Sequence, residues 1–187
     1  MGILNKVHII HNSDRLDRYK ILMLELEKQG IKEYELFPSV YDSVAPYYGI
    51  NKAHKNVIQY AKNNGLESII VAEDDVKFFG AGAFDYWVAN RPDDFDMWLA
   101  GIYLGEISNG ITERFTGLTL YECHSRFYDT FLSLDEYEHI DIAMAYKGLF
   151  KVCEPFIVRQ HNGFSDNEKR HMNYDFIFDN RPIYSAN

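Results

Sequence analysis

The sequence has little cysteine and no long apolar run. Cys123 and Cys153 are its two cysteines; they form no Cys-x-x-Cys pair and are too few for a disulfide scaffold. No apolar segment approaches the ~20 residues of a membrane span. The start, MGILNKVHIIHNSD, lacks the apolar core and cleavage site of a signal peptide, and Lys6 stands where a myristoylation site has Ser or Thr. We therefore expect a cytoplasmic protein without a transmembrane segment, whose membrane contact, if any, is peripheral.

The sequence also lacks any run of basic residues. With 19 Lys and Arg against 28 Asp and Glu, its formal net charge is −9. Proteins that bind duplex DNA or RNA present clustered Lys and Arg to the phosphates, so we expect no nucleic-acid partner. An acidic protein can still bind a diphosphate where divalent cations or a few arginines offset the repulsion. No repeat, low-complexity tract or linker interrupts the chain, so residues 1–187 are expected to form one domain.

The residues that are present indicate an α/β fold. The composition, 47% hydrophobic and 16% aromatic, is that of a globular protein. Strand-like and helix-like patterns alternate over the first 75 residues in the order β-α-β-α-β, which is typical of a mostly parallel sheet with crossover helices. The predicted elements are a strand over 6–11, a helix capped by Ser13 or Asp14 and ended by Gly30, a strand over 33–40, a helix over 50–63 and a strand over 69–72.

The pattern is looser after residue 75. Short helices are expected over 83–90 and 125–134, and a further helix over 136–148. Strands are expected over 95–105 and 116–124, and one or two strands over 149–161.

Three consecutive acids follow the apolar strand Ile69–Ala72. Glu73, Asp74 and Asp75 stand where this strand leaves the core, and open α/β sheets bind ligands at the carboxyl ends of their strands. Carboxylates at such a place are either a solvated turn or a site for Mn²⁺ or Mg²⁺, which prefer oxygen ligands. In an extended chain Glu73 and Asp75 share one side and Asp74 faces the other, whereas a turn at this place would rearrange them.

The segment GINKAHKNVIQYAKNNGLESIIVAEDDVKF resembles the core of the family 25 glycosyltransferases, the lipooligosaccharide and collagen galactosyltransferase group. Gly49, His54 and the block Glu73–Val76 match that family's pattern in register. At the start, VHIIHNSDRLDR resembles the opening strand and loop of the family, with Asp17 and Arg18 aligned. The late segment VRQHNGFSDN is similar to its closing Gln and Ser-Asp. The resemblance covers most of the chain and is strong from Gly49 to Val76.

This resemblance implies a GT-A-like, three-layer fold and an inverting hexosyltransferase. The donor would be a UDP-sugar, for example UDP-galactose, and the cofactor Mn²⁺ or Mg²⁺. The acceptor would be a glycan or lipid-linked glycan, as in lipooligosaccharide biosynthesis. Asp74 and Asp75 would bind the metal and, through it, the donor diphosphate. Glu73, on the donor side, would orient the acidic motif or bind through water. His161 would be the third metal ligand, although a lone histidine is more often a surface or core residue.

Further candidates come from the chemistry of single residues. Planar guanidinium groups suit a diphosphate, so Arg15 and Arg18 are expected at the donor, although both could be surface residues. His54 is expected either to contact the donor or to have a structural role. An inverting transfer needs a general base. We assign it to Asp141, because the neighbouring apolar residues Ile140 and Ile142 would raise the pKa of its carboxyl; an acidic helix face is the alternative.

Two other functions fit parts of this pattern. A metal-dependent phosphohydrolase or nuclease could use the acid triplet together with Asp141 and His161, but it would need a second acidic cluster and, for a nuclease, a basic surface. A non-catalytic relative could keep the fold and bind a glycan or a nucleotide. Turnover of a UDP-sugar with Mn²⁺ separates the three.

Overall fold

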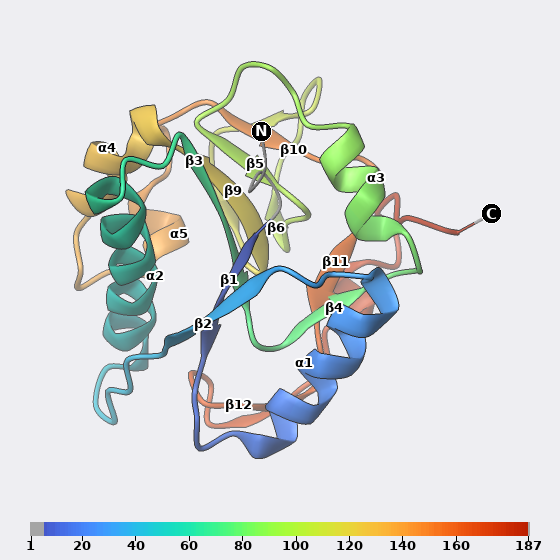
Figure 1. Cartoon of the computed structure of the whole chain (residues 1–187), viewed down its shortest axis with the longest axis horizontal. Helices are drawn as coiled ribbons and strands as arrows, with labels where there is room; N and C mark the ends of the chain where they lie inside the picture. Colours follow the sequence, from blue (N-terminus) through green and yellow to red (C-terminus); the bar gives the residue numbers. More distant parts are fainter. Residues whose placement is uncertain (1–5, 187) are drawn as a thin grey trace.

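The computed structural model describes residues 6–186, and a seven-stranded sheet runs through its centre (Figure 1). The strands lie in the order β2-β1-β3-β9-β5-β10-β7. Five of them (β2, β1, β3, β5 and β10) point in one direction, whereas β9 and β7 run antiparallel to their neighbours, so the sheet is mostly parallel, as predicted. The strands span Val7–His11 (β1), Tyr34–Pro38 (β2), Ser68–Glu73 (β3), Met97–Leu99 (β5), Ile111–Thr112 (β7), Leu120–His124 (β9) and Phe150–Val152 (β10).

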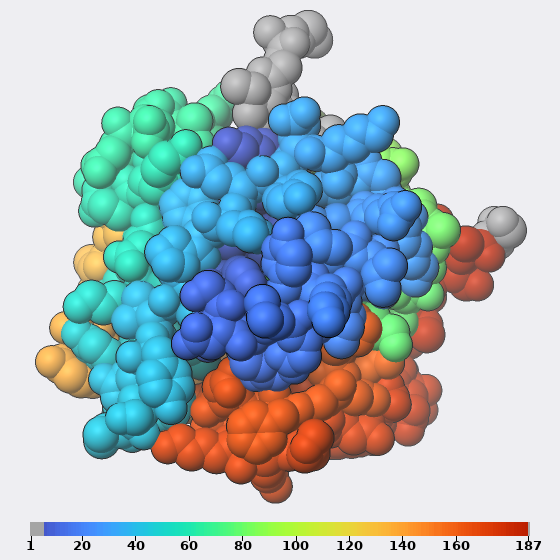
Figure 2. Space-filling view, turned by 60° about the horizontal axis from the view of Figure 1, so that its bottom comes forward, coloured from blue at the N-terminus to red at the C-terminus, as the bar shows by residue number. Residues whose placement is uncertain are grey.

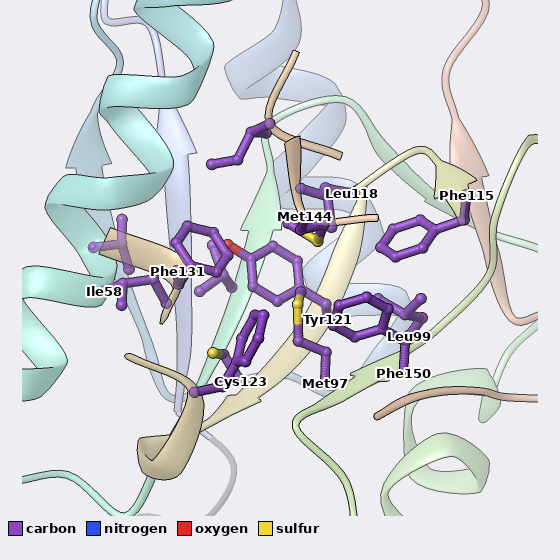
Figure 3. Packing of buried hydrophobic residues seen from close by; sticks show 14 of the residues in the cluster. Ile58, Met97, Leu99, Phe115, Leu118, Tyr121, Cys123, Phe131, Met144 and Phe150 are labelled. Carbon is purple, nitrogen blue, oxygen red and sulfur yellow. The ribbon is translucent and has the colours of Figure 1, made fainter. Parts of the chain in front are cut away.

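Helices cover both faces of this sheet and give the molecule three layers. Helices α1 and α3 lie on one face, and α2, α4 and α5 lie on the other (Figure 1). Each interface holds its own hydrophobic cluster, and Figure 3 shows Tyr121 of β9 in the middle of the one beneath α2 and α4. The helices span Leu16–Gln29 (α1), Pro46–Asn63 (α2), Ala83–Ala89 (α3), Tyr128–Leu132 (α4) and Ile140–Ala143 (α5), and single 3₁₀ turns span Ser125–Phe127 and Asp175–Ile177.

Strand β3 sends its side chains alternately into the two clusters. Ile69 and Val71 pack towards α2, whereas Ile70 and Ala72 pack towards α1. The continuous apolar run was predicted to be a strand covered on both faces, and this prediction is confirmed. The strand ends at Glu73, and Asp74 and Asp75 lie in the turn that follows it.

Short strand pairs surround the central sheet. β4 (Val76–Phe78) pairs with β11 (Val158–Gln160), and β6 (Leu104–Gly105) pairs with β8 (Phe115–Thr116). A late hairpin is formed by β12 (Gly163–Ser165) and β13 (Arg170–Met172). This hairpin lies beneath the end of β1 and the beginning of α1 (Figure 1), and Figure 2 shows the late, orange part of the chain packed against the blue N-terminal part.

Several predicted boundaries need correction. Helix α1 ends at Gly30, which adopts the left-handed conformation as expected, but its N-cap is Arg15 rather than Ser13 or Asp14. Helix α2 begins earlier than residue 50, because Pro46 is well suited to a first helical turn. In residues 6–186 no helix has the length and hydropathy that crossing a bilayer requires.

The helix predicted over 136–148 is mostly absent and is reduced to α5. The preceding carbonyl groups are bound by side chains of α2 instead of by helical amides. Nδ2 of Asn51 donates to the carbonyls of Asp135 and Glu138, at 2.9 and 3.1 Å, and Nζ of Lys55 donates to the carbonyl of Leu134. Asp141 is therefore held at the start of a four-residue helix rather than in the middle of a long one.

We expect Gly49→Ala to destabilise the fold. A Cβ at this buried position of α2 would overlap the backbone oxygen of Val40, which cannot move like the end of a side chain. Overpacking of this kind costs about 1–3 kcal/mol, measured by urea unfolding. In the control, Gly163→Ala, the added Cβ meets no atom within 4 Å. Equal stability of the two variants would contradict the prediction.

Candidate functional site

A cavity of about 430 Å³ opens at the carboxyl ends of β1 and β3. Its walls come from the segment after β1, the loop after β2, the beginning of α2, the acid triplet, the segment between β8 and β9, α5 and the late hairpin. Open α/β sheets bind their ligands at this edge. The expectation that the triplet lies where a central strand leaves the core is confirmed, because β3 is the third strand of the sheet and ends at Glu73.

Asp74 points towards α1 and is fully engaged. Its Oδ1 lies 2.8 Å from Nη1 of Arg18, and its Oδ2 lies 2.8 Å from Nδ1 of His11 and accepts the backbone N–H of Asn12 at 3.2 Å. The residue is only 5% exposed. Asp74 was predicted to bind metal and donor; here its carboxylate ties the end of β3 to β1 and α1.

Asp75 is less well satisfied. Its Oδ2 lies 3.1 Å from Nη1 of Arg18, whereas its buried Oδ1 has no hydrogen-bond partner among residues 6–186. Burial, together with the negative charge of Glu73, raises the pKa of Asp75 to about 8. A buried carboxylate with one unpartnered oxygen is suited to a cation or a hydrogen-bond donor that arrives with a ligand.

Glu73 lies on the α2 side and is held by two side chains. Nε2 of Gln160 donates to its Oε2 at 2.7 Å, and Nε2 of His54 lies 3.4 Å from its Oε1. Burial alone would raise the pKa of Glu73, but the bonds from His54 and Gln160 outweigh it and hold the pKa below its usual value. His54 is itself 1% exposed, with Nδ1 2.9 Å from the hydroxyl of Tyr121. His54 thus orients Glu73.

The two predicted donor-binding arginines have different surroundings. Arg15 forms a two-bond contact with Asp17, at 2.9 and 2.8 Å, and a 2.6 Å contact with Asp166 of the late hairpin. Arg18 lines the cavity, bridges Asp74 and Asp75, and donates to the carbonyl of Phe164 at 3.1 Å. Arg15 therefore fastens the hairpin to α1, and Arg18 is the one that reaches the acids.

His161 lies beside Asp75 but faces another way. Its backbone N–H donates to the carbonyl of Asp75 at 2.7 Å, while its buried Nε2 lies 3.9 Å from Oε1 of Glu25. Burial lowers the pKa of its imidazole. It lines a separate cavity of about 60 Å³, together with Arg15 and Arg18. Across the described part of the chain, no three His, Cys, Asp or Glu side chains are grouped so that they could hold a metal ion.

Asp75 and Glu73, rather than the whole acid triplet, are the residues that could hold a cation with the help of a ligand. Mg²⁺ and similar ions are commonly held by one or two carboxylates, with substrate phosphates and water completing the shell. Asp75 offers an unpartnered oxygen, and Glu73 leaves the strand on the cavity side. Asp74 and His161 would have to leave their present contacts to join them.

Asp141 lines the same cavity from α5. Its Oδ2 accepts the backbone N–H of Gly117 at 3.0 Å, and its Oδ1 accepts that of Ile142 at 2.9 Å. The apolar enclosure that was expected is incomplete, because Ile142 is exposed. The structure thus brings Asp141 to the same cavity as Arg18, His54 and the triplet, and leaves Arg15 and His161 outside it.

Two residues of the site were not among the candidates. Gln160 binds Glu73 through its side chain and donates its backbone N–H to the hydroxyl of Tyr103 at 2.9 Å. Burial, with the nearby charge of Asp75, raises the pKa of Tyr103 well above its usual value. A signal existed for Gln160, since it is the Gln of the closing segment VRQHNGFSDN; none marked Tyr103 among 14 tyrosines.

Comparisons with known proteins find similarity in structure but not in sequence. No protein-family profile and no curated protein matches the sequence. Among solved structures, A197 from STIV aligns over 98% of both chains, with a TM-score of 0.56 and 11% identity. HddC from Yersinia pseudotuberculosis aligns over 80% of this chain and 90% of its own, with a TM-score of 0.54 and 12% identity, and its complex with GMP-PN aligns with a TM-score of 0.52.

A looser match, with a TM-score of 0.46, 12% identity and coverage of 80% and 81%, is a glycosyltransferase involved in the glycosylation of the major capsid of PBCV-1. Identities this low establish similarity of fold alone. The chain is a Rossmann-like α/β protein whose acidic cavity lies at the carboxyl ends of its parallel strands.

Proposed function

We propose that this protein is a metal-dependent, inverting glycosyltransferase of the family 25 type with a GT-A-like fold. It moves a hexose, galactose being the first to test, from a UDP-sugar to a glycan or lipid-linked glycan acceptor, as in lipooligosaccharide biosynthesis. The carrying observation is the buried Oδ1 of Asp75, which has no partner among residues 6–186 and lies at the cavity end of β3.

The charge of the cavity supports the need for a cation. Arg18 is the only Lys or Arg among the described residues that line it, and it already bridges Asp74 and Asp75. A diphosphate would be repelled here unless a divalent ion came with it. The acids that line the cavity are Asp42, Glu73, Asp74, Asp75, Asp141, Asp166 and Glu168.

The proposed roles follow from the contacts. Asp75 and Glu73 would hold Mn²⁺ or Mg²⁺, Arg18 would approach the donor diphosphate, and His54 keeps Glu73 in place. A bound ion would supply positive charge at the departing diphosphate. The acceptor hydroxyl oxygen forms a bond to the anomeric carbon as the bond from that carbon to the diphosphate breaks; Asp141 takes the hydroxyl proton, and the nucleoside diphosphate leaves.

We expect Mn²⁺ and UDP together to stabilise the fold more than either of them does alone. The acidic cavity should bind the diphosphate only through a cation, and ligand at a hundredfold excess over its dissociation constant adds about 2.7 kcal/mol. The measurement is thermal unfolding with UDP, Mn²⁺, both, or both with EDTA. GDP is tested in parallel, because the structure of HddC was solved with GMP-PN.

Thermal unfolding, combined with assays of UDP-sugar turnover and phosphate release, distinguishes the proposed function from the other two. Equal unfolding temperatures with Mn²⁺ and with EDTA would refute the metal-bridged donor. Stabilisation without turnover of any UDP-sugar, hydrolysis to UDP included, would indicate a non-catalytic binding protein. Release of phosphate from simple phosphate esters would indicate a phosphohydrolase, although the described residues provide no group of three His, Cys, Asp or Glu side chains placed to hold a metal ion.

A further inference from the structure

The cavity has a second group of lining residues, outside the acid triplet, that the roles above use only through Asp141. It is built from the first turn of α2, the segment before β9 and the residues around α5. We call it the α5 wall; its residues are Tyr47, Thr116, Gly117, His139, Asp141 and Ile142.

The polar centre of the α5 wall is a fixed carboxylate. Each oxygen of Asp141 accepts one backbone N–H, from Gly117 or from Ile142, and keeps lone-pair capacity for a ligand hydroxyl. Gly117 has φ +98°, a backbone conformation that residues with a side chain rarely adopt, and a Cβ there would lie 3.1 Å from the ring of Tyr103. A glycine at this position therefore allows the backbone to place its N–H against Asp141. The carboxylate is an acceptor of hydrogen bonds held in one place.

The apolar part of the wall is an aromatic surface. The rings of Tyr47 and His139 lie 5.4 Å apart with an angle of 41° between their planes. Ile142 is exposed beside Asp141. An aromatic face next to an acceptor-only group suits a ligand that has an apolar face and hydroxyl groups at its edge.

The charge of the wall decides which hydroxylated ligand fits. Its six residues include no Lys or Arg, and its one carboxylate, Asp141, carries a negative charge when ionised. A carboxylate or phosphate on the ligand would be repelled, and no acid triplet lies in this wall to bring a cation. Uncharged hydroxyl groups meet no such penalty, because they can donate to Asp141.

We propose that the α5 wall binds an uncharged sugar ring, with its apolar face on Tyr47 and one hydroxyl donating to Asp141, and that it rejects sugars bearing a carboxylate. Calling this ring the acceptor rests on the proposed transferase function. The binding of a sugar ring by the α5 wall does not depend on that function. Sugar binding and transferase activity can therefore be refuted independently.

The test uses ligands that differ only in charge: the methyl β-glycosides of galactose, glucose and N-acetylglucosamine, and the methyl β-glycosides of galacturonic and glucuronic acid. Dissociation constants are measured by NMR titration, with and without UDP and Mn²⁺. We expect at least one neutral glycoside to bind at least tenfold more tightly than its uronic acid partner. Asp141→Asn should narrow that ratio, because it removes the repelling charge.

Variants of Tyr47 in the α5 wall complete the test. Tyr47→Ala should weaken binding of the neutral glycoside about tenfold or more, whereas Tyr47→Phe, which keeps the ring, should bind like the parent. Tyr48→Ala is the matched control, because its ring stacks on Tyr137 and lies outside the cavity. Uronic acids binding as tightly as neutral sugars, no neutral glycoside binding, or Tyr47→Ala matching Tyr48→Ala would overturn the proposal. Sugar binding without any effect of UDP and Mn²⁺ on the fold would uphold the wall and refute the transferase.

Discussion

Asp75→Asn is expected to abolish transfer while making the metal-free fold more stable, and Asp74→Asn is expected to weaken the fold itself. The two carboxylates are adjacent in sequence but have opposite surroundings. Asp75 has a buried oxygen without a partner among residues 6–186 and lies close to Glu73, so ionising it in the folded protein costs free energy. Removing that charge should raise stability by about 0.5–2 kcal/mol and, by weakening the hold on the cation, lower turnover by about 10²–10³-fold.

Asp74 is paired with His11 and Arg18, so Asp74→Asn should lower the stability of the fold, whereas Asp75→Asn should raise it. The substitution would leave His11 and Arg18 without the carboxylate that now meets both of them at 2.8 Å. Breaking a buried ion pair from one side costs about 3–5 kcal/mol, and the shared Asp75 keeps the loss near the lower figure. Urea unfolding and UDP-sugar turnover are measured for both variants. A stabilised Asp74→Asn, or an Asp75→Asn that keeps its rate, would show that the roles of the two acids have been misassigned.

The stability difference between Asp75→Asn and the parent should depend on pH. The pKa of Asp75 is raised to about 8 in the folded protein, against about 3.9 in an unfolded chain. Between these values the folded state binds more protons than the unfolded state, so this group makes the parent less stable as pH rises from about 4 to 8. The variant lacks this contribution. Its advantage should therefore grow from pH 5 to pH 8 without metal, and a constant difference would contradict the assigned pKa.

The sequence predicted the parts of the site that depend on local pattern. Four apolar residues in a row correctly indicated a strand buried on both faces. Glu73 and Asp74 have different partners, as expected, but the chain turns at Asp74, and Asp75 contacts Arg18 as Asp74 does. The carboxyl end of such a strand is where α/β sheets bind ligands, so the cavity followed from the order of elements.

Contacts between distant parts of the chain could not be predicted in this way. Arg18 reaches Asp74 across 56 residues and Gln160 reaches Glu73 across 87, and no periodicity carries such pairings. The prediction of a helix over 136–148 was wrong for the same reason. Asn51 and Lys55 of α2 bind the carbonyl groups of Leu134, Asp135 and Glu138, before and at the start of the expected helix. Tertiary contacts overrode local propensity there.

Asp141→Asn is expected to separate binding from chemistry. If Asp141 is the base, its amide replacement cannot take the acceptor proton, and transfer should fall by about 10²–10⁴-fold. Affinity for UDP with Mn²⁺ should barely change, because the proposed donor contacts come from β3 and α1 rather than from α5. The amide oxygen can keep one of the two backbone hydrogen bonds, the one from Gly117 to the carboxylate, and only the bond from Ile142 is lost, so the fold should be kept.

The measurement pairs calorimetry of UDP–Mn²⁺ binding with single-turnover transfer. Glu138→Gln is the matched control: it removes a carboxylate three residues away, in the same loop but outside the cavity. Transfer that stays near normal in Asp141→Asn would remove Asp141 from the mechanism, and a loss in Glu138→Gln instead would place the base outside the α5 wall. If Asp141→Asn loses both UDP binding and the rate of transfer, Asp141 is part of the donor site, because a base that acts only on the acceptor leaves the donor complex intact.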